Sequence, residues 1–355
     1  MLTIVYQYSN DAYDDLASSR KRFISLNNES FIALPAAKNL NSSCNRFARV
    51  LISSNVGFGH RFGEVIMGMR LAQMTNATFV FDSEVWKRQG IHGKYEWLLD
   101  LLPLHDTEVT LLDIKNSKLN LRTVKDQFPN LISRSKGEFN DSCNLMFVAS
   151  WSSCNGNCFR SSYSGTYNEA KWRLREAYSR TRFEPTVQIF HNYTTQGILS
   201  IAWHMRGGDL VLHSSEEFYK NVATELVSVL QGYSYHVFFF GEDVLRIFPF
   251  IANFCRSFLS NHCSFPNASN GDTFYHFVVA DILVTSGSSF PIAASVFRSA
   301  LQPTFSVMPK GNSRTFYMMS EDIPISAEGH FEGSLSRDEI RAQIFSFVKS
   351  KSHCP

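Results

Sequence analysis

Residues 200–210 read SIAWHMRGGDL, an apolar run that breaks off into charged side chains and glycines. The apolar residues from Ile198 to Trp203 are typical of a buried strand. Glycines directly after a strand let the backbone turn sharply or approach another group closely. In α/β folds, ligands bind beyond such strand ends. We therefore expect a ligand site at the residues that follow this strand, which are His204, Arg206, Gly207, Gly208 and Asp209.

Two more strand-like runs follow in the second half of the chain, and each ends in an unusual turn. Residues His236 to Phe240 are followed by GED, and residues Asp281 to Thr285 run into SGSSF. A helix is predicted from Ser215 to Leu230, because a serine cap and two glutamates stand at its start. The sequence of residues 241–258, GEDVLRIFPFIANFCRSF, predicts one further helix. Apolar strands that alternate with helices indicate a parallel sheet with right-handed crossovers.

The first half of the chain contains a similar unit. Strand-like residues 49–53 and 78–81 are separated by NVGFGHRFGEVIMGMRLAQMTN, in which apolar residues recur at helical spacing. This pattern predicts a strand, a glycine turn, a helix and a second strand. A loop rich in Ser, Cys, Asn and Gly follows at residues 140–165, then a helix that ends before Pro185. We expect two domains, residues 1–185 and 186–355, because 355 residues exceed one ordinary core.

Composition excludes several classes of protein. The chain is 44% hydrophobic and 19% charged, which is typical of a globular protein. Its net charge of +2 is too small for a nucleic-acid-binding surface, so we expect no nucleic-acid partner. No apolar run approaches the roughly 20 residues that a transmembrane helix needs. We therefore predict a soluble chain without a transmembrane segment.

The cysteines and the start of the chain bear on its compartment. Seven cysteines is an odd number, and CNGNC lacks the spacing of zinc motifs, so we expect no metal site. A local disulfide at Cys154–Cys158 or Cys255–Cys263 is an alternative to buried free thiols. The start, MLTIVYQYSN, has no basic or apolar leader, and six Asn-x-Ser/Thr triplets are present. The prediction is a cytoplasmic location, or the Golgi lumen if a targeting segment precedes this sequence.

The three turns of the second half share a chemistry. In a parallel sheet their strand ends face one crevice. Arg206 presents a planar charged fork to phosphate oxygens, and Gly207 and Gly208 let main-chain amides approach the same group. Glu242 and Asp243 suit ribose hydroxyls or the N–H edge of a purine. The SGSSF turn adds hydroxyls and helix-start amides, through Ser286, Ser288, Ser289 and Phe290. Together these turns predict a nucleoside diphosphate site.

Three stretches resemble a known superfamily. HMRGGD resembles the H-x-R-R-G-D motif of the fucosyltransferases that make α1,2 and α1,6 linkages, a superfamily that includes the protein O-fucosyltransferases. DTFYHFVVADILVTSGSSFPIAASVF resembles the segment that grips the donor diphosphate, and NVGFGHRFGEVIMGMRLA the acceptor side. The resemblance implies the GT-B fold, with two Rossmann-like α/β domains facing across a cleft. It also implies inverting, metal-independent transfer of fucose from GDP-fucose to a glycan or glycoprotein hydroxyl, without a cofactor.

The resemblance also assigns roles. Arg206 would contact the β-phosphate and His204 would support its loop. Asp243, together with Glu242, would meet the guanine or ribose. The remaining donor pocket would comprise Asp272, Ser288 and Ser289, and the acceptor side would comprise Gly57, Gly59, His60 and Arg61. Gly207 departs from the motif, because it replaces the second arginine and so removes a cation.

Inversion needs a base near the acceptor hydroxyl. The candidates are His60, Glu64, Asp209 and His213, and we favour Glu64 or His60, which share one helix face at four-residue spacing. Asp209 has an alternative role, in which it orients Arg206 or the loop. The sequence contains no Asp-x-Asp that would hold a metal against a diphosphate, so Arg206 is expected to stabilise the leaving group. Two alternatives are a UDP-sugar donor such as UDP-xylose and a non-catalytic nucleotide-sugar or carbohydrate binding protein.

Overall fold

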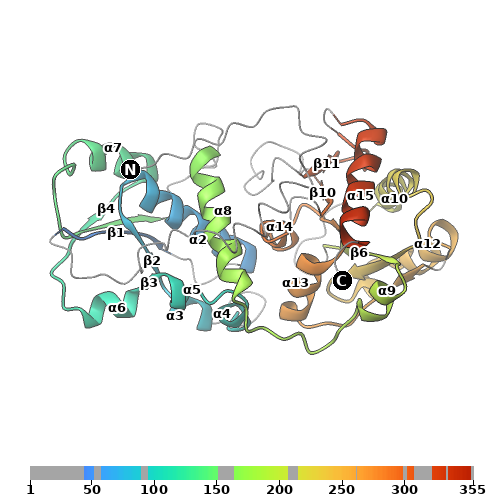
Figure 1. The fold of residues 1–355 in the computed structure, drawn as a ribbon, viewed down its shortest axis with the longest axis horizontal. Coiled ribbons are helices and arrows are strands. Elements are labelled where there is room, and N and C mark those ends of the chain that lie inside the picture. Colours follow the sequence, from blue (N-terminus) through green and yellow to red (C-terminus); the bar gives the residue numbers. More distant parts are fainter. Residues whose placement is uncertain are drawn as a thin grey trace.

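The computed structural model describes residues 44–51, 57–88, 95–150, 164–206, 215–260, 262–298, 302–307, 322–332 and 335–352. For residues 60, 164–169 and 352 the backbone alone is described. The elements of this part of the chain form two parallel sheets with helices packed against them (Figure 1). We call them the N-terminal half, up to residue 179, and the C-terminal half, from residue 191. The predicted fold class, two parallel α/β units, is confirmed.

The N-terminal half has a five-stranded sheet in the order β3-β2-β1-β5-β4. All its pairings are parallel, and the central pair β1 and β5 is matched along its whole length. The strands are β1 (Arg46–Leu51), β2 (Thr78–Phe81), β3 (Val109–Thr110), β4 (Arg122–Lys125) and β5 (Leu145–Ser150). The predicted order of strand, helix and strand is confirmed, since α2 (Phe58–Met74) lies between β1 and β2, although β1 starts three residues earlier than predicted. Residues 52–56, which include most of the predicted turn, lie outside the described residues.

Apart from α7 and α8, the other helices that the structure describes in the N-terminal half are short. Helix α6 starts in a capping box, in which Thr110 and Asp113 satisfy each other's backbone N–H groups. Helix α7 has a proline in its first turn, where the missing N–H is not needed. The bounds are α3 (Glu84–Lys87), α4 (Trp97–Leu101), α5 (Leu104–Thr107), α6 (Leu111–Asn116), α7 (Phe128–Lys136) and α8 (Ser164–Ser179).

The C-terminal half has a six-stranded sheet in the order β11-β10-β9-β6-β7-β8, again with parallel pairings. Buried side chains cover both faces of its central strand β6, as expected for a strand covered by helices. The strands are β6 (Leu199–His204), β7 (Tyr235–Phe240), β8 (Cys263–Ser264), β9 (Ile282–Val284), β10 (Thr304–Val307) and β11 (Ile323–Ile325).

The helix predicted from Ser215 to Leu230 is confirmed as α10, and the one predicted after it needs a correction. The Ser215 hydroxyl accepts from the Phe218 N–H at 3.2 Å and caps α10, as predicted. The single helix expected over residues 241–258 is wrong: two helices form there, because Pro249 disfavours a helical backbone at Phe248. The bounds are α9 (His191–Thr195), α10 (Glu216–Val229), α11 (Val244–Ile247), α12 (Ile251–Phe258), α13 (Asn270–Val279), α14 (Ser289–Ser295) and α15 (Arg337–Ser352).

The two halves share one hydrophobic core. Phe58 at the start of α2 has its ring centroid 5.1 Å from that of Phe274 on α13 and 5.4 Å from that of Phe290 on α14. Its neighbours Trp86 and Tyr95 are also fully buried, so these aromatic residues belong to the core. Figure 1 shows α2 and α8 on one side of this junction and α13 and α14 on the other. The halves are therefore packed together directly.

The chain passes between the halves over a short segment. The Arg182 N–H still donates to the Asp100 carbonyl of the N-terminal half, at 2.9 Å. Four residues later, the Thr186 N–H donates to Asp272 on α13, at 2.7 Å. The segment therefore leaves one half and reaches the other between these residues. A domain boundary near residue 185 stays a prediction.

Two disulfides lie within the described residues. Cys255–Cys263 joins α12 to β8 and confirms one of the predicted local pairs. Cys44–Cys143 was not expected, because 99 residues separate the two cysteines. The reason for it is the register of the sheet, which places Arg46 opposite Leu145 and so brings the residues two positions earlier together. Cys154 and Cys158 lie outside the described residues.

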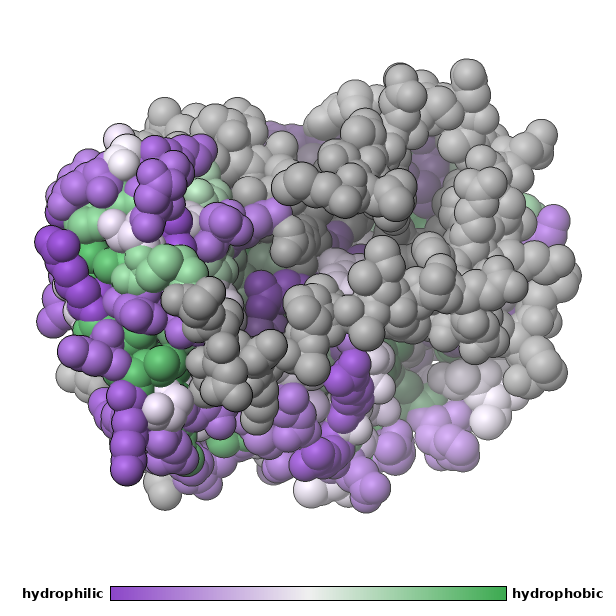
Figure 2. All heavy atoms as spheres, turned by 60° about the vertical axis from the view of Figure 1, so that its left-hand side comes forward, coloured by the Kyte–Doolittle hydropathy of each residue, from purple (hydrophilic) through white to green (hydrophobic). Residues whose placement is uncertain are grey.

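Figure 2 brings the N-terminal half forward and shows a mostly hydrophilic surface with a smaller hydrophobic area. Among the helices of the described segments, none combines the length and the hydropathy that crossing a bilayer requires.

Candidate functional site

The carboxyl edge of the C-terminal sheet collects the three turns that the sequence singled out. Strands β9, β6 and β7 are neighbours, and His204 lies opposite Phe240 at the ends of β6 and β7. The arginine turn (Met205 and Arg206), the turn of residues 241–243 and the serine turn (residues 285–288) therefore follow three adjacent strands. This edge is the candidate site.

The His204 side chain connects two of these turns. Its Nδ1 lies 2.6 Å from the Ser286 hydroxyl oxygen, and both side chains are buried. The ring also packs edge-on against Phe277, with the centroids 5.6 Å apart. Burial, and secondly the nearby charge of Arg206, lower the pKa of His204 to about 3. The imidazole is therefore neutral at pH 7, and the His204–Ser286 pair holds the arginine turn against the serine turn.

A glycine permits the close approach of the third turn. A Cβ on Gly241 would lie 2.5 Å from the Met205 carbonyl oxygen. The Met205 N–H also donates to the Phe240 carbonyl at 2.7 Å, so the arginine turn continues the β6–β7 pairing. Because the glycine has no side chain, the two backbones can come together there.

The two acidic residues after Gly241 are exposed at this edge. Asp243 has a left-handed backbone with φ of 44° and forms an ion pair with Arg246. Glu242 precedes it and is exposed as well. Both carboxylates are therefore accessible beside the arginine turn, although that of Asp243 is already paired.

Asp272 is placed differently from the other predicted donor residues. Its side chain is 1% exposed, and its oxygens accept from the Thr186 N–H, the Thr186 hydroxyl and the Ser269 hydroxyl, at 2.6–2.7 Å. Burial alone would raise the pKa of Asp272, but these hydrogen bonds outweigh it and lower the pKa. The structure gives Asp272 the role of tying the connecting segment to α13. Its contact with a donor stays a prediction.

The serine turn leads into α14, which meets the N-terminal half. Ser288 caps α14, accepting from the Phe290 N–H at 3.4 Å, and Ser289 is the first helical residue. A Cβ on Gly59 would lie 2.4 Å from the Ser289 hydroxyl oxygen and 2.5 Å from its carbonyl carbon. The starts of α2 and α14 are therefore in contact. Because each helix follows a strand of its own sheet, the carboxyl edges of both sheets converge at this contact.

On the predicted acceptor side, the start of α2 is largely buried. Arg61 is fully buried, donates to the carbonyls of Val85 and Arg88 at 2.8 and 3.3 Å, and lies over the Tyr95 ring at 4.9 Å. Burial lowers the pKa of Arg61, opposed by the charges of Tyr95 and Glu64. Glu64 is 1% exposed. These contacts anchor α3 and its following residue to α2.

Of the remaining predicted site residues, the structure describes Gly57 and the backbone of His60. Gly57 precedes α2 as its N-cap residue, and His60 lies in the first turn of α2, with only its backbone described. Four predicted residues lie outside the described part of the chain: Gly207, Gly208, Asp209 and His213.

Sequence reasoning missed the residues that act across long separations. Thr186 and Asp272 are 86 residues apart, and no local pattern marks Thr186 as a partner. His276 is similar: its Nε2 accepts from the Ile189 N–H at 3.1 Å, which fixes the same connecting segment. Such pairs follow from the packing of α13 on that segment and have no signature in the sequence.

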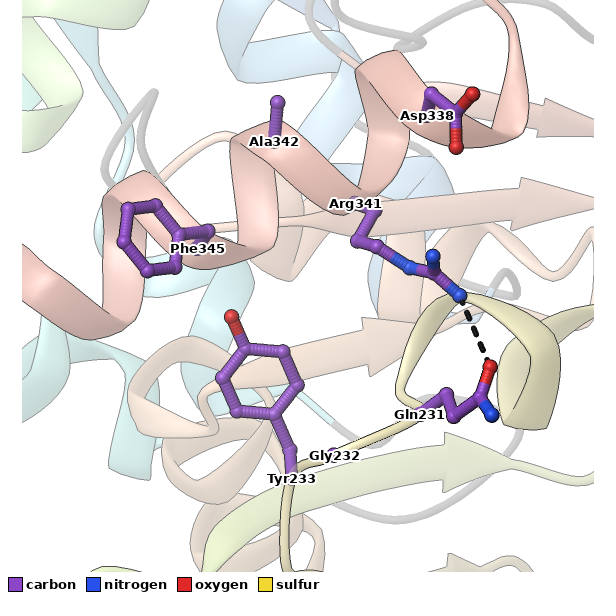
Figure 3. A pocket seen from close by; sticks show the side chains of 7 residues that line it. All are labelled: Gln231, Gly232, Tyr233, Asp338, Arg341, Ala342 and Phe345. Carbon is purple, nitrogen blue, oxygen red and sulfur yellow. Dashed lines mark hydrogen bonds between the residues drawn. The ribbon is translucent and has the colours of Figure 1, made fainter.

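A pocket of about 520 Å³ lies away from the candidate site (Figure 3). It is formed by α15 and the residues just before β7, so it lies at the amino edge of the sheet. Arg341 reaches across it to the Gln231 side-chain oxygen at 3.4 Å. The lining residues are Gln231, Gly232, Tyr233, Asp338, Arg341, Ala342 and Phe345.

Comparisons with known proteins add only distant structural likenesses. No protein-family model and no curated protein matches the sequence. Among solved structures, E. coli ADP-heptose lps heptosyltransferase II is 12% identical, with a TM-score of 0.41, over 87% of this chain and 99% of that one. The alpha-1,6-fucosyltransferase NodZ co-crystallized with GDP is 11% identical, with a TM-score of 0.42, over 72% of this chain and 93% of that one. At these identities and scores, no function transfers to this chain.

Proposed function

We propose that this protein is an inverting glycosyltransferase that moves fucose from GDP-fucose to a hydroxyl of a glycan. The observation that carries the proposal is the arginine turn at the carboxyl edge, held by the buried His204–Ser286 pair where the two sheets converge. Strand ends of this kind are where α/β proteins bind nucleotides. The H-x-R-x-G-D resemblance supports the same assignment.

Arg206 has the central role in this mechanism. The acceptor oxygen forms a bond to the sugar C1 while the bond from C1 to the β-phosphate oxygen breaks. The electron pair of that bond leaves with GDP, and the Arg206 guanidinium stabilises the growing negative charge. Because the His204 imidazole is neutral, it adds no positive charge that would repel Arg206. We propose that no metal ion is needed for this step.

The acceptor hydroxyl must lose its proton to a base. We propose His60 for this role, because it lies in the first turn of α2, next to the contact between Gly59 and Ser289. Glu64 lies one helical turn further on and is fully buried, which suits a residue that orients a neighbour. Asp209 and His213 remain alternative bases.

The first experiment tests transfer itself. The purified chain is incubated with GDP-fucose and a panel of sugar acceptors in the presence of EDTA, and GDP release is measured. We expect acceptor-dependent GDP release that EDTA does not abolish. An absolute requirement for a divalent ion would contradict the role of Arg206. Binding of GDP without any acceptor-dependent release would instead favour the non-catalytic binding protein.

A second experiment tests the donor. Exposed Glu242 and Asp243 beside the arginine turn suit the N–H groups of guanine, so GDP should raise the melting temperature more than UDP does. A ligand at 100 times its dissociation constant adds about 2.7 kcal/mol of stability, which such a measurement detects. A larger shift with UDP would favour the alternative donor, a UDP-sugar such as UDP-xylose.

A further inference from the structure

We propose that Asn76, Asn140 and Asn192 carry N-linked oligosaccharides, added while the chain is in an oxidising, lumenal compartment. The inference goes beyond the proposed activity and does not depend on it. Each residue opens an Asn-x-Ser/Thr triplet, which is the acceptor sequence for this modification. The triplets end in Thr78, Ser142 and Thr194.

The three asparagines are all exposed. Asn76 stands in the turn after α2 with φ of 49°, a left-handed conformation that asparagine tolerates. Asn140 lies in the turn after α7, and Asn192 lies on the short helix α9. Thr78 and Thr194 are exposed as well. An oligosaccharide at any of the three therefore extends into solvent without displacing the core.

Their position in the fold is also shared. Asn76 precedes β2, Asn140 precedes β5 and Asn192 precedes β6, so all three lie toward the amino edges of the two sheets. The candidate site lies at the carboxyl edges. Three oligosaccharides on the opposite side leave the approach to that site open.

In the triplet Asn267-Ala268-Ser269 the asparagine is exposed as well, but the triplet differs in its position and in the hydrogen bonds of its serine. It follows β8 and so lies at the carboxyl side of that strand. The Ser269 hydroxyl is already engaged, because it donates to the Asp272 carboxylate at 2.7 Å and accepts from the Asp272 N–H at 3.1 Å. We do not include Asn267 in the proposal.

The two disulfides supply an independent observation. Disulfides form and persist in oxidising compartments and are rare in the cytosol. Cys44–Cys143 lies close to one of the triplets, since the Asn140 carbonyl accepts from Arg46 at 2.9 Å, two residues from Cys44. In eukaryotic cells, disulfides form in the same lumenal compartment in which asparagine receives oligosaccharides. The cysteine pairs and the exposed triplets therefore point to the same place.

The modification is a group transfer with a lipid-linked oligosaccharide diphosphate as donor and a membrane-bound oligosaccharide transferase as catalyst. The asparagine Nδ2 forms a bond to C1 of the first sugar, and the bond from C1 to the diphosphate oxygen breaks. The electron pair leaves with the lipid diphosphate, and the amide nitrogen gives up one proton. The asparagine side chain remains an uncharged amide.

The test uses the full chain secreted from eukaryotic cells behind a cleavable leader. Peptide N-glycosidase F in heavy-oxygen water converts each glycosylated asparagine to an isotope-labelled aspartate, which peptide mass spectrometry locates. We expect label at positions 76, 140 and 192, with a matching increase in gel mobility. Secreted, disulfide-bonded protein that is unlabelled at all three positions overturns the proposal, as does label confined to position 267.

Matched variants assign each site without changing the asparagines. Thr78→Val, Ser142→Ala and Thr194→Val each remove one triplet, and each should remove one label and one step in the gel. Thr78→Ser keeps the triplet and should keep the label. Label that persists in Thr78→Val argues against the triplet as its cause. If a variant is not secreted, the enzyme treatment of the unaltered chain still decides, and GDP release by that chain is read separately.

Discussion

The two halves of this molecule place an arginine near a glycine turn in opposite ways. In the C-terminal half, Arg206 is partly exposed at the end of β6, beside a buried histidine–serine pair. In the N-terminal half, Arg61 is fully buried in α2 and donates to two backbone carbonyls. Both residues were candidate ligand contacts from the sequence. Burial and existing partners therefore decide whether such a cation faces a ligand or stabilises the fold.

Among the described residues, each half also has one disulfide, and we expect the largest effect on stability from the removal of the one in the N-terminal half. Cys44–Cys143 closes a loop of 99 residues, and Cys255–Cys263 a loop of 8. In the chain-entropy account these loops correspond to about 4.7 and about 2.5 kcal/mol. Cys44→Ser/Cys143→Ser should therefore lower the free energy of unfolding more than Cys255→Ser/Cys263→Ser does. Urea titrations of both double variants measure the free energy of unfolding. Equal losses in the two variants would show that loop length does not determine how much each disulfide stabilises the protein.

Replacing the two arginines gives the sharpest contrast in function. Arg206→Ala should lower the rate of GDP release by about 10²–10³-fold, the range found for groups that stabilise a developing oxyanion. Its melting temperature should change little, because the side chain is partly exposed. Steady-state kinetics and a thermal scan of the same preparation provide the two readouts.

Arg61→Ala is the matched control. It removes charge-assisted hydrogen bonds to the buried Val85 carbonyl and the partly buried Arg88 carbonyl, so the protein should lose about 3 kcal/mol of stability. If Arg206→Ala unfolds the protein while Arg61→Ala abolishes transfer in a stable one, the roles derived from burial are reversed and the comparison fails.

The contact between the halves is tested by two glycines of one helix. Gly59→Ala places a Cβ against the Ser289 backbone, and we expect a loss of about 1–3 kcal/mol from overpacking together with slower transfer. Gly68→Ala places its Cβ 2.5 Å from the Phe79 ring, inside the N-terminal half. It should lower stability without slowing transfer. If both variants slowed GDP release equally, the contact between the two halves would have no special role in the proposed site.

The strands β1, β2, β6, β7 and β9 and the long helices α2, α8 and α10 could be predicted from the sequence, because apolar runs and turn residues are local signals. The other strands of the described residues, β3, β4, β5, β8, β10 and β11, were not predicted. The Ser215 cap of α10 and the short strand β9 are examples. Pro249 is a local signal as well, because it interrupts the single helix that the apolar pattern predicts there. Local pattern therefore accounts for these elements and for the edge where the three turns meet.

Long-range partners could not be predicted in the same way. The burial of Arg61 depends on α3 packing against α2, and the Asp272 carboxylate is occupied by a residue 86 positions away. The Cys44–Cys143 pair became geometrically evident only once β1 and β5 were known to be neighbours. A polar residue near a turn can face solvent, a ligand or the core, and tertiary packing alone distinguishes these outcomes.

The smallest expected effect concerns the pH dependence of the His204–Ser286 pair. The pKa of His204 is lowered to about 3 in the folded protein, whereas in the unfolded chain it has its usual value of about 6.5. Below pH 6.5 the unfolded chain therefore binds a proton that the folded protein does not, and stability falls as the pH falls. Between pH 6.5 and 5 the contribution of this residue is about 2 kcal/mol. In His204→Gln, the urea midpoint should decrease less steeply over that range. His276, whose pKa is also lowered by burial, accounts for part of the decrease that remains. A decrease of unchanged steepness in His204→Gln would show that the imidazole titrates normally, and the neutral pair that holds the two turns of the C-terminal half would then have to be abandoned.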